Sequence, residues 1–196
     1  MARPREFDID DVLTQSMNVF WTQGYKATSM EDLMKATGLN KQSFYCAFGD
    51  KRGLFIKALA LYRKNSTVMM KDKLAQAESP LQGLEEIFHS MIARCDGGGC
   101  MMVNAVQEFG TGDAEIAAET RQMFQNFEKL VADALAQGQK QGEVTTAYPA
   151  PLMAKNLVSM LSGLRVMEKR GESPKTLKSI LEMSFDAIRP KKPIKV

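Results

Sequence analysis

Residues 28–48 constrain the fold most, because a short amphipathic segment is followed after barely one turn by a second one. Gly38 lies between the two segments, and glycine tolerates the positive φ that such a tight turn requires. Leu33, Leu39 and Phe44 fall where two helices that cross at a steep angle need apolar contacts. This spacing predicts two short helices joined by a tight turn, the helix-turn-helix arrangement.

Capping signals predict further helices on both sides of this unit. The run TSME at residues 28–31 has the form of a capping box, in which the Thr28 hydroxyl and the Glu31 carboxylate are expected to bind each other's backbone amides. Asp8 is expected to cap a helix that precedes the unit, and Asp50 a long helix that follows it. The N-terminal region is therefore predicted to hold three helices, continued by a long connecting helix.

Helical periodicity also dominates the rest of the chain, and no segment alternates like a half-buried strand for more than a few residues. Proline stands at positions 80, 149 and 174, where each apolar-periodic segment begins, as is common at the first turn of a helix. We therefore predict an all-α fold of about nine helices. Its expected domains are a three-helix domain at residues 1–50 and a helical domain at residues 51–196.

The positive charge of the chain is concentrated near its N-terminus. Residues 1–65 carry 10 Lys or Arg against 7 Asp or Glu, whereas residues 66–196 carry 16 of each, which gives a formal net charge of +3. A basic N-terminal third suits a module that faces phosphates, attached to a neutral body.

The cysteines and the apolar segments limit where such a protein works. Cys46, Cys95 and Cys100 are too few and too irregularly spaced for a disulfide scaffold, so we expect reduced thiols. No apolar run approaches the roughly 18 residues needed to cross a bilayer, and the N-terminus lacks the apolar segment of a signal peptide. These features predict a cytoplasmic protein with no membrane partner.

The outer face of the second short segment is polar. Asn40, Lys41, Gln42 and Ser43 are residue types that bond base edges and phosphates in the major groove. On spacing alone a second interpretation stays open, in which three core-forming helices have a polar face that is only hydrated.

The flanking residues distinguish these interpretations. Around the turn they are Gly38-Leu39, Ser43-Phe44-Tyr45, Ala47-Phe48-Gly49-Asp50-Lys51 and Leu54, and upstream they are Phe20, Gly24, Tyr25, Thr28 and Leu33. Together they closely resemble the signature of the TetR family of bacterial transcription regulators. The resemblance covers about residues 8–55, with one departure: Met34 stands where a small residue usually lies at the helix crossing.

This resemblance implies a ligand-responsive transcriptional regulator, a repressor that binds a palindromic operator in double-stranded DNA as a homodimer. Phosphate contacts set its register and base contacts set its sequence preference. Gln42 is the expected base reader, because its amide can form two hydrogen bonds with adenine. The implied contacts are Thr28, Tyr45 and Lys51 to phosphates, Asn40, Lys41, Gln42 and Ser43 to the major groove, and Arg3 and Arg5 from the N-terminal arm.

The resemblance also implies that the last two helices of each subunit form a four-helix bundle in the homodimer. Ser159 and Gly163, four residues apart, would allow close helix approach. The sequence alone leaves open that these helices bury each other inside a monomer. The expected interface residues are Leu157, Leu161, Leu177, Ile180, Leu181, Ser184, Phe185 and Ile188.

A small-molecule effector is expected in the body of the protein. The chain holds 14 methionines, and cavities lined by methionine adapt to varied apolar ligands. The lone histidine, His89, is expected to have a structural role. The predicted pocket residues are Phe88, Met91, Cys95, Cys100, Met101, Asn104, Met123, Phe127, Met160 and Leu164.

Cys100 offers an alternative trigger, because it follows three glycines and opens a helix, where backbone amides favour a thiolate. A similar Gly-Cys start with Asn four residues later resembles a subset of TetR-like regulators, including repressors that respond to electrophiles. An inert, packed cysteine is the other interpretation. The spacing of His89, Cys95 and Cys100 fits no usual metal site, so we expect neither a metal nor a cofactor.

An enzyme that uses the body cavity is a further alternative of another class. Catalysis would need paired carboxylates, a Ser/His/Asp set or a metal cluster, and the sequence offers none that can be assembled around one histidine. We therefore expect no enzymatic activity.

Overall fold

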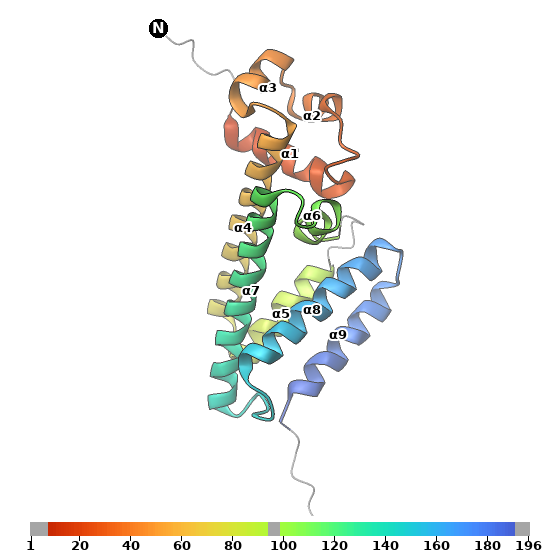
Figure 1. Ribbon diagram of the computed structural model, residues 1–196. Coiled ribbons are helices and arrows are strands. Elements are labelled where there is room, and N and C mark those ends of the chain that lie inside the picture. The colour runs from red at the N-terminus through yellow and green to blue at the C-terminus, as the bar shows by residue number, and fades with distance from the viewer. Residues whose placement is uncertain (1–7, 94–98, 191–196) are drawn as a thin grey trace, which may run out of the picture. The chain divides into compact units, whose positions relative to one another are not determined.

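The computed structural model describes residues 8–93 and 99–190, and these residues form nine helices and no strand (Figure 1). The predicted all-α fold is thereby confirmed. The helices are α1 (Ile9–Gln23), α2 (Met30–Thr37), α3 (Lys41–Phe48), α4 (Lys51–Gln76), α5 (Pro80–Ala93), α6 (Met101–Phe109), α7 (Ala114–Gln141), α8 (Ala150–Lys169) and α9 (Pro174–Ile188).

The chain divides into two compact units. Of the described residues, the N-terminal unit comprises 8–66 and 99–121, and the C-terminal unit comprises 67–93 and 122–190. The predicted boundary at residue 50 divides the chain once, into two continuous segments. The units instead follow packing in space, which groups α6 with α1–α3. Among the described helices, none is long and apolar enough to cross a membrane.

The first helix forms as the sequence predicts. Asp8 has an extended backbone, and its side chain accepts a hydrogen bond from the Asp10 amide at 2.8 Å. This satisfies one of the amides that a helix start leaves without a partner. The buried face of α1 carries Val12, Met17 and Phe20.

The predicted capping box at α2 is wrong by one residue. Ser29, with φ −88° and ψ 164°, is the N-cap, and its hydroxyl accepts from the Asp32 amide at 3.0 Å. The Asp32 carboxylate accepts a hydrogen bond from the Ser29 amide at 2.8 Å. The hydrogen bonds from the Ser29 hydroxyl and amide lower the pKa of Asp32. Because the helix starts one residue later than expected, Asp32 and not Glu31 occupies the third helical position.

The turn and the second short helix have the predicted arrangement. Gly38 adopts a left-handed conformation at φ 67°, directly after α2. The helix starts at Lys41, because Asn40 is its N-cap and accepts from the Ser43 amide at 2.8 Å. Leu33 and Phe44 are buried, which anchors both short helices in the core of the N-terminal unit.

The long helix α4 begins at a cap that the sequence also predicted, since the Asp50 carboxylate accepts from the Gly53 amide at 2.6 Å. Its first turns belong to the N-terminal unit. There Phe55 meets Phe20 edge-on at 5.0 Å between ring centroids and lies 4.9 Å from Tyr25 and 5.7 Å from Phe109. This aromatic cluster joins residues of α1, α4 and α6.

The core of the C-terminal unit is formed by α5, α8 and α9 together with the second half of α7. Phe88 contacts Phe185 edge-on at 5.4 Å and Phe127 at 5.6 Å between ring centroids. A buried ion pair lies beside this core: Arg165 Nη1 is 2.6 Å from Glu168 and donates to the Met91 carbonyl at 2.6 Å. That contact ties α8 to the last turn of α5.

Candidate nucleic-acid interface and effector region

The recognition face lies on α3, whose two sides differ sharply. Phe44 and Phe48 are buried, whereas Lys41, Gln42 and Tyr45 are exposed, Tyr45 by 44%. With about 3.6 residues per turn, the polar residues share the solvent side of the helix. These three predicted DNA contacts are therefore accessible to a groove or a phosphate.

Two neighbouring predicted contacts sit at the helix start. Asn40 is exposed but lies before the helix, and its Oδ1 caps the Ser43 amide. Only its side-chain NH₂ is left to donate, which suits a phosphate or a base acceptor. Ser43 is partly exposed. Arg3 and Arg5 lie outside the described residues.

Thr28, an implied phosphate contact, is buried directly before the α2 cap. Its side chain is 1% exposed, and its hydroxyl donates to the Gly24 carbonyl at 2.6 Å. The phosphate contact implied for Thr28 stays a prediction, and the structure adds a role in the turn. The Thr28 hydroxyl closes the turn between α1 and α2. It bonds back to Gly24, which directly follows α1, while Thr28 itself directly precedes the α2 cap.

Lys51 contacts the same turn from α4. Its ammonium donates to the carbonyls of Tyr25 at 2.8 Å and Thr28 at 2.7 Å, and it lies 4.3 Å from the centroid of the Tyr25 ring. A lysine has three N–H groups, and these contacts use two of them. The predicted phosphate contact at Lys51 stays a prediction, and the structure adds a second role in holding the turn.

Sequence reasoning missed Glu108 on α6. Its carboxylate accepts from the Tyr25 amide at 2.9 Å and from the Lys26 amide at 2.7 Å, across 83 and 82 residues of sequence. No local pattern announces such a contact. A partial signal existed in Gly24, which the family resemblance included and which packs directly against this carboxylate.

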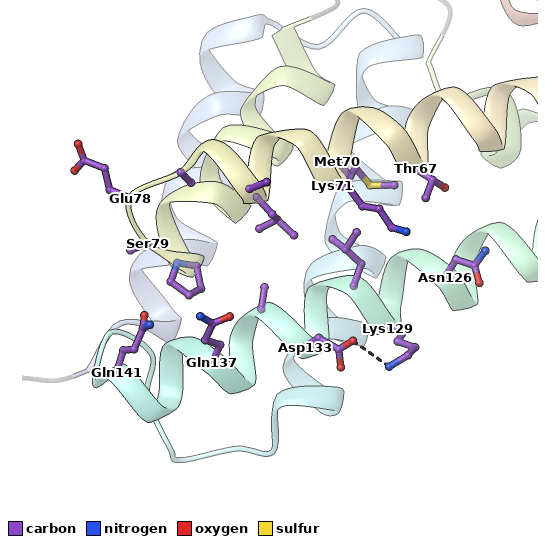
Figure 2. Close-up of a pocket in the computed structure, with 16 residues that line it drawn as sticks. Thr67, Met70, Lys71, Glu78, Ser79, Asn126, Lys129, Asp133, Gln137 and Gln141 are labelled. Carbon is purple, nitrogen blue, oxygen red and sulfur yellow. Dashed lines mark hydrogen bonds and ion pairs between the residues drawn. The ribbon is translucent and has the colours of Figure 1, made fainter.

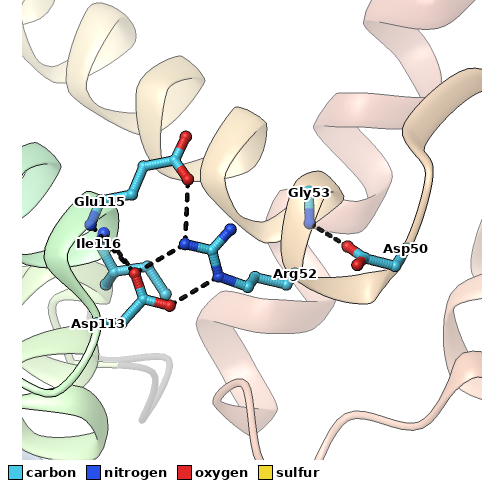
Figure 3. Close-up of polar contacts among 6 residues, drawn as sticks. All are labelled: Asp50, Arg52, Gly53, Asp113, Glu115 and Ile116. Carbon is cyan, nitrogen blue, oxygen red and sulfur yellow. Dashed lines mark hydrogen bonds and ion pairs between the residues drawn. The ribbon is translucent and has the colours of Figure 1, made fainter.

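Arg52, also missed, braces the first turn of α4 against the start of α7 (Figure 3). Its guanidinium donates two hydrogen bonds to the Asp113 carboxylate, at 2.7 and 2.8 Å, and lies 3.0 Å from Glu115. Asp113 also accepts from the amides of Glu115 and Ile116, so it caps α7 as well. These bonds, led by those from Arg52, lower the pKa of Asp113 to about 2.

The predicted dimer residues mostly face inward. Six of the eight are buried within the chain, namely Leu157, Leu161, Leu177, Leu181, Phe185 and Ile188, whereas Ile180 and Ser184 are partly exposed. The stripe they form packs α8 and α9 into the core with α5, and the contact of these residues with a second subunit stays a prediction. The exposed apolar side chains of α8 and α9 are Leu152 at 57%, Val166 at 40% and Met183 at 66%.

The predicted effector residues divide between the units. Cys100, Met101 and Asn104 belong to the N-terminal unit, and Phe88, Met91, Met123, Phe127, Met160 and Leu164 belong to the C-terminal unit. Cys95 lies outside the described residues. Met101 and Asn104 are buried, and so are Phe88, Met123, Phe127 and Leu164.

A cavity of about 840 Å³ in the C-terminal unit lies between the last turns of α4, the start of α5 and the second half of α7 (Figure 2). Met70, Leu74 and Leu130 give it an apolar lining, and Lys71 and Gln137 are among its polar groups. None of the predicted effector residues that the structure describes lines it. Lys129 and Asp133 also border it and pair with each other at 3.0 Å.

Cys100 is the N-cap residue of α6, as the sequence predicted for a helix start. Its Sγ lies 3.7 Å from the Tyr62 hydroxyl, and Cys100 and Cys46 form no disulfide. The preceding carbonyl, of Gly99, accepts from the Trp21 indole N–H at 2.9 Å. Within the described part of the chain, no group of three or more His, Cys, Asp or Glu is placed to hold a metal ion.

Comparison with known proteins assigns both parts of the chain. Residues 12–58 match a family model described as "Bacterial regulatory proteins, tetR family". Residues 77–183, more than half of the chain, match a model described as "Tetracyclin repressor-like, C-terminal domain".

Individual relatives are similar over nearly their whole length. The HTH-type transcriptional repressor ComR of Escherichia coli (strain K12) is 28% identical over 184 residues, 91% of this chain and 88% of ComR. The HTH-type transcriptional repressor DhaR of Mycobacterium sp. (strain GP1) is 24% identical over 182 residues, 91% of each protein.

A solved structure resembles the whole fold. A cysteine mutant of the TetR family transcriptional regulator CifR, complexed with 26-bp double-strand operator DNA, has a TM-score of 0.83 and 27% identity and covers 95% of this chain and 100% of its own. The chain therefore belongs to the TetR family of bacterial regulatory proteins, which confirms the predicted helix-turn-helix transcriptional regulator.

Proposed function

We propose that this protein is a repressor that binds a palindromic operator in double-stranded DNA and releases it when a small molecule binds. The exposed polar face of α3 carries the proposal, since Lys41, Gln42 and Tyr45 project from a helix whose other side is buried. The similar CifR was solved with operator DNA, and relatives such as ComR are named repressors.

The residues of α3 have separate roles in this proposal. Gln42 reads a base, because its amide offers a donor and an acceptor to an adenine edge. Tyr45 and Lys51 bind phosphates and fix the register without reading sequence, and Lys41 faces the major groove. Asn40 contributes its side-chain NH₂ from the cap position.

Selection of bound fragments from genomic DNA, followed by fluorescence anisotropy with the selected site, tests this assignment. Gln42→Ala is expected to lose about 1–3 kcal/mol of discrimination at one base position, whereas Tyr45→Phe weakens binding to all sequences alike. Gln125→Ala, on the exposed side of α7, is the matched control and leaves both unchanged. Absence of any salt-sensitive DNA binding by the wild-type protein contradicts the assignment.

The repressor acts as a homodimer, because two reading helices can then engage successive major grooves, roughly 34–36 Å apart. The outer side of α8 and α9 is the proposed interface. It carries Leu152, Val166 and Met183 in exposed positions, and a Cβ at Gly163 would meet nothing within 4 Å. Apolar side chains exposed to this extent, beside a glycine that permits close approach, favour a helix pair from a second copy.

The effector is proposed to be an apolar or mixed-polarity small molecule bound in the C-terminal domain. It acts by population shift, because it binds better to the state in which the two reading helices do not match the operator. Phe88 and Phe127, two residues of the predicted pocket, are buried and in contact, so a ligand beside them would meet an apolar surface. A screen of small molecules for operator release identifies the effector, and the less disruptive Phe127→Leu should change its half-maximal concentration without changing operator affinity.

A second candidate trigger is covalent modification of Cys100. It is favoured by one observation: the Cys100 thiol and its neighbouring carbonyl contact Tyr62 and Trp21, whose rings meet edge-on at 5.4 Å. A bulky adduct on the thiol would disturb that junction. Operator release is measured with N-ethylmaleimide for the wild type, Cys100→Ser and the control Cys46→Ser. An unchanged response in Cys100→Ser removes the covalent route.

A further inference from the structure

The turn between α1 and α2 is held by charged side chains from two other helices. Glu108, in the last turn of α6, accepts hydrogen bonds from two consecutive backbone amides, those of Tyr25 and Lys26. Lys51, in the first turn of α4, donates to two carbonyls of the same turn, those of Tyr25 and Thr28. The turn backbone is thus bound through its donors by a carboxylate and through its acceptors by an ammonium.

Such contacts are stronger than ordinary backbone hydrogen bonds, because one partner in each is ionised. The carboxylate bonds are 2.9 and 2.7 Å long, within the usual range for charge-assisted hydrogen bonds. Tyr25 is partly buried, so water competes weakly with Glu108 for its amide.

Gly24 makes room for this contact. A Cβ at Gly24 would lie 2.6 Å from Oε1 of Glu108, closer than nonbonded atoms approach, and the residue adopts φ +83°. A left-handed glycine therefore lets the carboxylate reach the two amides that follow it.

The end of α6 contacts the turn through a second side chain as well. The ring of Phe109, next to Glu108, lies 4.9 Å from the Tyr25 ring and 5.7 Å from the Phe55 ring. The start of α6 is also fixed to α1, through the hydrogen bond from Trp21 to the Gly99 carbonyl. Both ends of α6 thus contact α1 or the turn that follows it.

We infer that Glu108 is a positioning residue for DNA recognition, which fixes the α1–α2 turn and through it the orientation of α2 and α3. The Ser29 cap of α2 follows Lys26 by three residues, α2 packs on α1, and Leu33 of α2 and Phe44 of α3 are both buried in the core of the N-terminal unit. A change at the end of α6 thereby reaches the reading helix. The inference rests on the proposed operator binding. It names Glu108 as the residue through which α6 affects that binding.

Loss of the carboxylate leaves two turn amides without their partner and widens the range of turn conformations. Apparent operator affinity then falls in proportion to the fraction of molecules that hold the binding-competent turn. From the usual contribution of a hydrogen bond to a charged group, we expect operator binding about tenfold weaker in Glu108→Ala. Glu108→Gln keeps one acceptor oxygen and is expected to fall between this variant and the wild type.

The experiment compares wild type, Glu108→Ala, Glu108→Gln and the control Gln107→Ala, which removes an exposed side chain from the same helix. Operator Kd is measured by anisotropy, and a stoichiometric titration gives the active fraction, so that partial unfolding is separated from weaker binding. Hydrogen exchange of backbone amides reports the contact itself. Exchange should accelerate at Tyr25 and Lys26 but not at Gly24, whose amide donates to Phe20 within α1.

We expect the operator Kd to be highest for Glu108→Ala, intermediate for Glu108→Gln and lowest for the wild type, with all three proteins fully active. Faster exchange should be confined to the amides of Tyr25 and Lys26. Unchanged or tighter operator binding by Glu108→Ala overturns the inference, and so does faster exchange spread evenly over the N-terminal unit. The proposed function is judged separately, by whether the wild-type protein binds its selected operator at all.

Discussion

The Asp113 carboxylate accepts two hydrogen bonds from the Arg52 guanidinium, at 2.7 and 2.8 Å, while it also caps the first turn of α7. One side chain thus joins the helix that follows the DNA-reading segment to the helix that leaves the N-terminal unit (Figure 3). Both contacts need the ionised carboxylate, which is why the pKa of Asp113 falls to about 2.

This pairing predicts a loss of stability in acid. The folded pKa of about 2 lies below the ordinary value of 3.8, so the stabilisation is fully present above pH 3.8 and is lost as the pH falls through about 2. Chemical denaturation followed from pH 5 down to about pH 2 should show this decline, and Asp113→Asn should weaken it. Asp133→Asn removes an exposed ion pair and is the control. Equal acid profiles for wild type and Asp113→Asn contradict the prediction.

The corrected start of α2 makes a second prediction. Ser29→Ala removes the N-cap hydroxyl that accepts from Asp32 and is expected to lower the free energy of unfolding by about 1 kcal/mol. Glu31→Ala should have little effect, because the Glu31 side chain is exposed and stands outside the capping box. Urea denaturation of both variants decides between the two capping boxes. A box formed by Thr28 and Glu31, as expected from the sequence, would make the Glu31 variant the less stable one and leave Ser29→Ala nearly unchanged.

A third prediction concerns Gly24. An alanine there meets both a backbone conformation (φ 83°, ψ 167°) that is essentially restricted to glycine and the Glu108 carboxylate, so Gly24→Ala should destabilise by more than the roughly 1–3 kcal/mol of the conformation alone. Gly142→Ala is the control for a positive φ without a clash, because Gly142 has φ +75° and nothing within 4 Å of the added Cβ. Thermal unfolding compares the two. A loss at Gly24 no larger than at Gly142 shows that the carboxylate moves aside without cost.

Local signals in the sequence were enough to predict most of the fold. Periodicity and capping types located the helices, and the Asp8 and Asp50 caps are found as predicted. The start of α2 was misplaced because Thr28 and Ser29 are both good capping residues. Their backbone angles, which decide between them, depend on how Thr28 is buried in the turn.

The site was predictable only where it depends on one helix. The exposed side of α3 follows from helical spacing, whereas the contact of Glu108 with the α1–α2 turn joins residues more than 80 positions apart. The apolar stripe on α9 showed that Leu181 and its neighbours are buried, but not by what. The structure buries them within the chain and leaves Met183 outside.

The two sides of α9 therefore lead to opposite predictions for association and stability. Met183→Glu places a charge on the proposed interface and should convert a dimer to a monomer with little change in the stability of the isolated subunit. Leu181→Ala leaves a cavity in the core and should cost about 2–5 kcal/mol while self-association persists. Sedimentation velocity and denaturation of both variants separate these effects. A Met183→Glu protein that stays dimeric would move the interface away from this side of α9, and operator binding by such a dimer should be unimpaired.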